Sequence, residues 1–214
     1  MNDYTAGKAW KIERRQTIIE TAYRLFSQKG IEEVLMTQVA NEAGIGISTL
    51  NRYFHSKLDL VVAVSIWTWD VYISAYNQSF PKEEWDRWSG GEYLRIYMDA
   101  FIDLYRNHGD LLRFNYNFNS YLRYEGGAEK QKLSMMNMVN ELGKLFHTYY
   151  ERGMQDGTLN ADIPEETMFS GSFHIMLAAV TRYATGLVYV SETQDDPEND
   201  LIMLKELLLS KYLR

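Results

Sequence analysis

The sequence contains no cysteine and only three prolines in 214 residues. Without cysteine the chain can form no disulfide, no zinc–thiolate site and no cysteine nucleophile, and this composition fits a reducing cytosol. Pro81, Pro164 and Pro197 each fall where a helix is expected to begin or end, because proline disrupts helix interiors. So few helix breakers predict long helices.

The sequence also lacks a long apolar run. Residues 1–16 contain no apolar stretch of the kind that signal peptides carry. The longest run without a charged side chain covers residues 167–181, fewer than the roughly 20 residues that a membrane-spanning helix needs, and we interpret it as a buried helix. We therefore expect a cytoplasmic protein without a membrane segment.

Groups of catalytic or metal-binding side chains are missing as well. The four histidines show no metal-ligand spacing with carboxylates, and no nucleophile can be paired with a base. The glycines at 44–46 follow no predicted strand, as a nucleotide-binding loop would require. We expect no enzyme activity, no metal ion and no cofactor.

Positive charge is scarce and unevenly distributed. The chain has a net charge of −7 at pH 7, which argues against general affinity for nucleic acid. Residues 1–57 hold eight Lys and Arg against six Asp and Glu, a net charge of +2, which leaves −9 for the remainder. A protein whose residues 1–57 are basic and whose remaining residues (the body) are acidic can contact phosphate at one face only.

The sequence does contain strong helical periodicity. Apolar side chains recur at helical spacing through residues 9–29, and Gly30 marks the end of that helix. Two short helices are predicted at 36–43 and 47–54, with Gly44 in the turn between them. Two short helices around a tight turn are what a protein needs to place one helix in the DNA major groove.

Longer helical patterns follow this pair. They cover residues 57–79, 92–106, 111–123, 128–155 and 164–189, and a ninth begins at 197. Ser56 is expected to cap the first of these, with Asp59 as its partner. No strand-like alternation persists anywhere, so we predict an all-α fold of about nine helices.

The last two predicted helices are apolar on every side and therefore need cover on every side. A second subunit is the simplest cover, because two helices from each chain would form a four-helix interface around a two-fold axis. The alternative is that other helices of the same chain cover both of these helices. The residues predicted for this homodimer interface are Phe173, Leu177, Val180, Leu204, Leu207 and Leu208.

The N-terminal motifs resemble those of the TetR family of bacterial transcriptional regulators. The matching elements are A-x-x-L-F-x-x-x-G from Ala22 to Gly30, V-A-x-x-A-G from Val39 to Gly44, and T-L-x-x-Y-F-x-S-K from Thr49 to Lys57. The resemblance implies a helix-turn-helix DNA-binding domain at residues 1–56. It also implies an effector-binding and dimerisation domain at residues 57–214.

In a helix-turn-helix, the first half of the second helix faces base edges in the major groove. Here Ile47 could pack on a thymine methyl group, Asn51 could bond adenine through N6 and N7, and Ser48 would lie beside them. For Tyr53, packing under the turn is an equal alternative to DNA contact. The residues predicted to lie near operator phosphate are Thr37, Gln38, Thr49, Arg52, Tyr53, His55 and Lys57.

The aromatic residues of the predicted body suggest an effector site. Aromatic side chains make up 14% of the chain. The resemblance implies a pocket among the middle helices that would hold an amphipathic or aromatic small molecule, and a simple packed core is the alternative. The candidate lining residues are Trp67, Tyr72, Tyr97, Phe101, Tyr105, Phe114, Phe118, Tyr121, Met135 and Met138.

The resemblance also implies a mechanism. In a dimer, the two DNA-binding domains (residues 1–56 of each chain, the heads) would contact successive major grooves about 34–36 Å apart. An effector would shift the helix at 57–79 and change this spacing. The repressor would then be released from its operator. Two departures from the family pattern leave a second interpretation open, a TetR-like fold that binds a protein partner instead of DNA. Val34 and Leu35 stand where the family usually has threonines before the second helix, so the usual cap is lost, and Arg52 is the only basic residue of the recognition helix. Asn51 stands where the family often has an aromatic residue.

Overall fold

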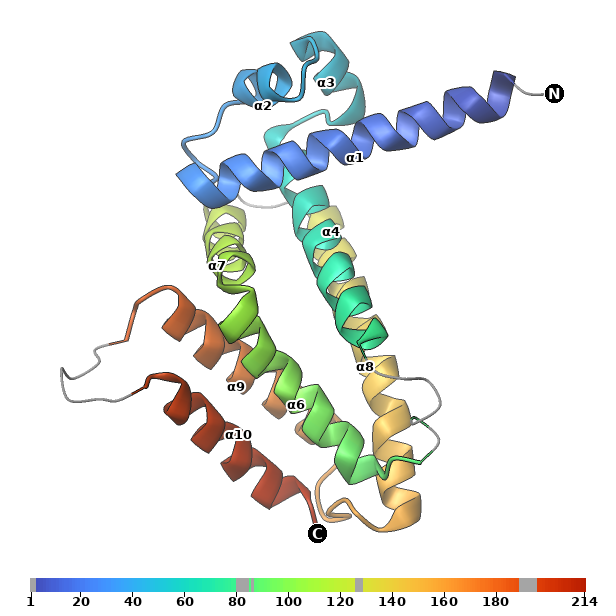
Figure 1. The fold of residues 1–214 in the computed structure, drawn as a ribbon, viewed down its shortest axis with the longest axis vertical. Coiled ribbons are helices and arrows are strands. Elements are labelled where there is room, and N and C mark those ends of the chain that lie inside the picture. Colours follow the sequence, from blue (N-terminus) through green and yellow to red (C-terminus); the bar gives the residue numbers. More distant parts are fainter. Residues whose placement is uncertain (1–2, 80–84, 86, 126–128, 189–195) are drawn as a thin grey trace. The chain divides into compact units, whose positions relative to one another are not determined.

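The computed structural model of the chain describes residues 3–79, 85, 87–125, 129–188 and 196–214, and leaves aside the side chains at 3–8, 129–135, 137 and 138. Within these residues the regular elements are nine helices (Figure 1), so the all-α prediction is confirmed. The helices are α1 (Asp3–Lys29), α2 (Met36–Glu42), α3 (Ile47–Tyr53), α4 (Lys57–Gln78), α6 (Gly90–Asn107), α7 (Gly109–Tyr124), α8 (Glu129–Asp156), α9 (Glu165–Ala184) and α10 (Glu198–Tyr212).

Most helix boundaries lie within two residues of the prediction, and two lie further away. α1 begins at Asp3 rather than at residue 9, so its first turns precede the apolar periodicity on which the prediction relied. α9 ends at Ala184 rather than at 189, because Gly186 has a φ of +70°. Glycine adopts this left-handed conformation without strain, and it commonly ends a helix.

Side-chain caps explain where several helices begin. Ser56 Oγ accepts a hydrogen bond from the Asp59 N–H at 3.0 Å, as predicted for the start of α4. At α6, Ser89 Oγ accepts from the Glu92 N–H at 3.2 Å, and the Glu92 carboxylate accepts from the Ser89 N–H at 2.7 Å. This reciprocal pair stabilises a helix start at Gly90, although glycine is a poor helix former.

The chain divides into two compact units. Unit 1 contains residues 1–72 and 114–135, and unit 2 contains residues 73–113 and 136–214. Neither unit is continuous in sequence, whereas the predicted domains meet at residue 56. The difference arises because most of α4 and most of α7 pack with the N-terminal helices.

Unit 1 has one core that α1, α2, α3, α4 and α7 share. The Tyr23 ring of α1 meets Phe114 of α7 edge-on, with 5.6 Å between centroids, and meets Trp67 of α4 at 5.8 Å. α4 is long and apolar enough to span a membrane by length and composition alone. Its side chains Leu60 and Val64 are fully buried in this core, however, and a core helix satisfies the same two criteria.

Unit 2 is built around mutual packing of α6, α9 and α10. α8 joins α6 through an unusually close approach, because a Cβ atom on Gly90 would lie 2.1 Å from the Gly153 Cα. Residues 158–160, which follow α8, are tied to the end of α10. There the Asn160 N–H donates to the Tyr212 carbonyl at 2.8 Å, and the Arg214 N–H donates to the Thr158 carbonyl at 3.0 Å.

Candidate nucleic-acid interface

The turn between α2 and α3 is short and tightly bonded. Gly44 has a φ of +67°, which bends the chain directly after α2. The Ile45 N–H then donates to the Ala40 carbonyl at 2.9 Å, and the Gly46 carbonyl accepts from the Leu50 N–H at 3.1 Å at the start of α3. The predicted helix-turn-helix geometry is therefore present in unit 1.

α3 has a buried face and an exposed face. Leu50 is fully buried, and Phe54 at the C-cap is 3% exposed, so both hold α3 on the unit 1 core. The Ile47 side chain is 39% exposed, and Asn51 is exposed beside it. The predicted base-reading residues lie together on a surface that a major groove could accept. Ser48, Arg52 and His55 are also exposed, whereas Thr49 and Tyr53 are half-buried.

The start of α2 is capped in a way that the sequence did not suggest. Leu35 is the N-cap residue and has no polar side chain to offer. Instead, Gln38 reaches back, and its Oε1 accepts a hydrogen bond from the Leu35 N–H at 2.8 Å. Gln38 thus holds the helix end, while Thr37 stays exposed at the first turn of α2. A helix N-terminus of this kind favours a nearby phosphate.

Lys57 has partners inside unit 1. Its Nζ donates to the Glu32 carbonyl at 2.9 Å and lies 5.7 Å from the centre of the Tyr121 ring. Burial lowers the pKa of Lys57, and the nearby carboxylate of Glu32 partly offsets that effect. The side chain therefore fastens the segment before α2 to the start of α4, a structural role that sequence reasoning missed.

The ten predicted effector-pocket residues fall into separate groups. Phe114, Phe118 and Tyr121 are buried in the unit 1 core, with Trp67 packed against it. Tyr72, also in unit 1, packs edge-on against a neighbouring tryptophan on α4. The side chains of Met135 and Met138 lie outside the described residues.

In unit 2, the Tyr97 ring packs edge-on against Phe101 at 5.4 Å and against Phe146 at 5.2 Å. Burial raises the pKa of Tyr97 above its ordinary range, so the phenol stays neutral. Tyr105 lines a small polar pocket of about 450 Å³ beside the ion pair of Arg106 and Glu198. The structure therefore does not bring the predicted residues around one described cavity.

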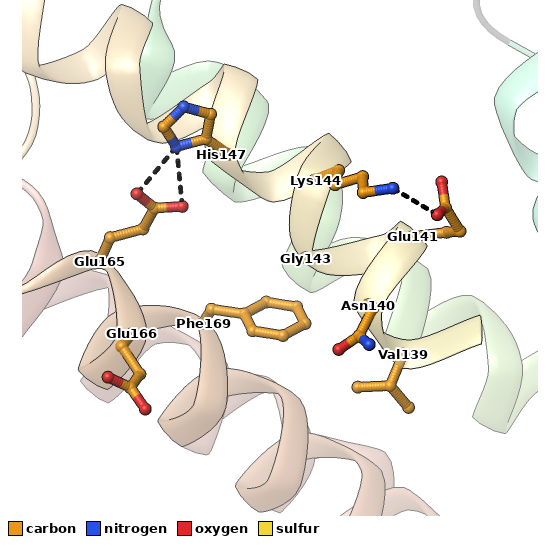
Figure 2. A pocket seen from close by; sticks show the side chains of 9 residues that line it. All are labelled: Val139, Asn140, Glu141, Gly143, Lys144, His147, Glu165, Glu166 and Phe169. Carbon is orange, nitrogen blue, oxygen red and sulfur yellow. Dashed lines mark hydrogen bonds and ion pairs between the residues drawn. The ribbon is translucent and has the colours of Figure 1, made fainter. Parts of the chain in front are cut away.

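A larger pocket lies between α8 and α9 in unit 2 (Figure 2). Its volume is about 930 Å³, within the range of small-molecule sites. It combines an aromatic ring with charged groups of both signs. The lining residues are Val139, Asn140, Glu141, Gly143, Lys144, His147, Glu165, Glu166 and Phe169. This pocket was not predicted from the sequence, because its residues are ordinary members of two helix surfaces.

Two of the ion pairs beside this pocket are mapped in Figure 2. His147 Nδ1 lies 2.9 and 3.0 Å from the two carboxylate oxygens of Glu165, and Lys144 Nζ lies 2.6 Å from Glu141 Oε1. The other ring nitrogen of His147 lies 3.4 Å from Glu151, one helical turn away. The hydrogen bond to Glu165, followed by the charge of that carboxylate, raises the pKa of His147 above its ordinary value.

This pair predicts a pH dependence. A folded-state pKa above the unfolded value means that the pair stabilises the fold below the ordinary histidine pKa of about 6.5, and that this stabilisation is lost as the pH rises through the raised pKa. We expect an NMR titration to give a His147 pKa above 6.5 that Glu165→Gln lowers and Glu166→Gln leaves in place. An unchanged His147 pKa in Glu165→Gln would contradict the assignment.

The predicted dimer residues differ in their exposure. Phe173 and Val180 are buried within unit 2 and offer little or no surface to a second chain. Leu177, Leu204 and Leu208 are half-buried, and Leu207 is 60% exposed. The exposed apolar residues that the prediction omitted on α9 and α10 are Ile175 and Met203. The apolar character of these helices therefore divides between internal packing and an outward surface.

Comparisons with known proteins agree with this architecture. A family model described as bacterial regulatory proteins, tetR family, matches residues 18–64. An HTH-type transcriptional regulator of Staphylococcus aureus strain MRSA252 is 33% identical over 121 residues, which are 56% of this chain and 63% of the relative. A regulator of strain USA300 is 32% identical over the same shares. The chain thus spans less than two thirds of the length of these relatives.

Solved structures extend the likeness along the chain. A TetR transcription regulator from Haloarcula marismortui has a TM-score of 0.74 at 15% identity, and the match covers 94% of this chain and 99% of the other. The fatty acid degradation regulator FadR from Bacillus halodurans has a TM-score of 0.67 at 16% identity, over 92% and 94%. The chain therefore shares the fold of solved TetR regulators, and its residues 18–64 match the model of bacterial regulatory proteins, tetR family.

Proposed function

We propose that the protein is a transcriptional regulator that binds double-stranded operator DNA through α3. The observation that carries this proposal is the two-sided character of α3, with Leu50 fully buried and Ile47 and Asn51 exposed on the other face. A helix held rigidly from behind can present a fixed pattern of side chains to base edges. Phosphate contacts from Thr37 and Arg52 would then set its position on the duplex.

We further propose that the protein acts in the cytoplasm as a homodimer. The exposed apolar residues Ile175, Met203 and Leu207 on α9 and α10 support this arrangement, because a second copy would remove them from water. A two-fold axis would place one α3 on each of two half-sites about 34–36 Å apart.

We also propose that a small molecule releases the protein from its operator. The pocket between α8 and α9 is a suitable candidate site, because it offers the Phe169 ring beside Lys144 and Glu166 to an amphipathic ligand. α4 contributes residues to both units, and effector binding would act on the head through this helix. A coupling free energy of about 1–3 kcal/mol between the two sites suffices for such regulation.

The DNA-binding proposal is tested with the native chain and with Asn51→Ala. Fluorescence anisotropy against duplexes that tile the DNA upstream of the coding sequence, at two salt concentrations, should reveal one duplex that binds more tightly than the rest. Asn51→Ala is expected to weaken that selective binding by about 1–3 kcal/mol, without changing its dependence on salt. The wild-type complex itself should weaken as salt rises.

Two results would count against this function. No binding to any duplex at low salt would favour the alternative, a protein-binding adaptor with the same fold. Equal selectivity of the wild type and Asn51→Ala would remove α3 from its proposed role as the reader of the operator.

A further inference from the structure

Residues 9–17 of α1 contribute no buried side chain to the protein core. Within the residues whose side chains are described, none from 9 to 17 is buried, and the first buried positions are Ile18 and Ile19. Figure 1 shows this part of the helix extending past α3. Isolated helical segments of this length are only marginally stable in water. A helical segment without buried side chains therefore suggests a binding surface that becomes better ordered when a partner binds it.

The composition of this segment is strongly biased. Residues 8–15 carry Lys8, Lys11, Arg14 and Arg15 against the single acid Glu13, a local net charge of +3 in a chain whose total is −7. The matched family model begins at residue 18, so this segment lies before it. Such a concentration of positive charge on an acidic protein fits an anionic polymer.

One contact places the basic residues beside the recognition helix. The Arg15 guanidinium lies 5.1 Å from the centre of the Phe54 ring, and Phe54 is the C-cap residue of α3. Lys11 stands one helical turn before Arg15 and therefore shares its face of α1. On the neighbouring face, the Arg14 guanidinium lies 5.1 Å from the exposed Trp10 ring. The basic surface is thus continuous with the end of α3.

We propose that residues 9–16 form an arm that binds the phosphate backbone of duplex DNA next to the base pairs that α3 reads. This inference rests on the proposed function. α3 contains only one basic residue, Arg52, and Lys57 is engaged with the Glu32 carbonyl. The arm adds cations beside a recognition helix that carries only one, and phosphate contacts of this type raise affinity for every sequence equally.

The test measures how affinity for a random-sequence duplex of about 40 base pairs depends on salt, because phosphate contacts are independent of sequence. The test variant is Lys11→Gln with Arg14→Gln, which spares Arg15 and its contact with Phe54. The matched control is Arg87→Gln with Arg123→Gln, an equal loss of charge at exposed positions outside the arm. Circular dichroism melting of all three proteins checks that the fold is intact.

For the test variant we expect the slope of log K against log salt to fall by about 0.9 for each phosphate that the protein no longer neutralises, while the control keeps the wild-type slope. Backbone amides of residues 9–16 in the wild type should exchange more slowly with solvent deuterium when the duplex is added. Both results would support the arm. Failure of the wild type to bind any duplex at low salt would instead overturn the proposed function.

Two outcomes would overturn the arm and leave the proposed function standing. One is a wild-type slope in the test variant, with no added protection of residues 9–16. The other is an unchanged DNA slope together with loss of binding to vesicles of anionic phospholipid, which would assign the basic surface to a membrane.

Discussion

Leu50→Ala is expected to destabilise unit 1 by about 2–5 kcal/mol, because it removes a fully buried side chain from the core that fixes α3. Leu50 belongs to the same buried cluster as Phe26 of α1 and Leu60 of α4, so the cavity would open in the core that these helices share. Urea denaturation followed by circular dichroism should show an earlier unfolding transition than in the wild type. DNA binding should weaken in parallel, since α3 would lose its fixed position.

Asn51→Ala is the matched control, because it alters the next residue on the exposed face of the same helix. Its unfolding free energy should stay within about 0.5 kcal/mol of the wild type, as is usual for surface substitutions. Leu50→Ala would then lose both stability and DNA affinity, whereas Asn51→Ala would lose DNA affinity and keep its stability. An unchanged urea midpoint in Leu50→Ala would show that α3 is not held by this core.

Gly90→Ala should lower the free energy of unfolding of unit 2 by about 1–3 kcal/mol or more, because the added methyl group overpacks the contact between α6 and α8. A Cβ at this position would lie 2.1 Å from the Gly153 Cα and 2.9 Å from the Tyr149 carbonyl oxygen. Both neighbours are backbone atoms of α8, so no side chain can rotate to make room. Alanine favours a helix over glycine by about 1 kcal/mol, and the steric clash exceeds that gain. Differential scanning calorimetry would measure the shift in Tm.

Gly143→Ala provides the comparison, since this glycine also lies inside a helix of unit 2. Its added Cβ would meet the Phe169 ring at 3.4 Å, an ordinary van der Waals distance. We expect the stability of Gly143→Ala to equal or slightly exceed that of the wild type, because alanine favours the helix and its methyl group meets no steric clash. Equal melting temperatures for the two variants would mean that α6 and α8 approach less closely than the structure indicates.

The head could be predicted closely because its determinants are local. Gly30 and Gly44 both adopt left-handed backbone conformations at the ends of helices, as their positions after apolar periodic segments predict. Ser56 and Asp59 form the predicted cap. Each of these features depends on a few neighbouring residues, so composition and spacing contain the necessary information.

The partition of the aromatic residues could not be predicted in the same way. Phe118 belongs to the core of unit 1 and Phe101 to unit 2, yet both belong to apolar stripes at helical spacing. Periodicity identifies an inward-facing side chain without saying which helix it will meet. The close approach of Gly90 to Gly153 has the same origin, because two glycines far apart in sequence carry no local indication that they meet.

The discontinuity of unit 1 has a consequence for the order in which the chain folds during its synthesis. The core that positions α3 includes Phe114, Phe118 and Tyr121, which the ribosome adds well after the helix-turn-helix has emerged. At a synthesis rate of about 5–20 residues per second, several seconds pass between the synthesis of the helix-turn-helix and that of these rings. During that interval the growing chain exposes the apolar surface that these three rings later cover.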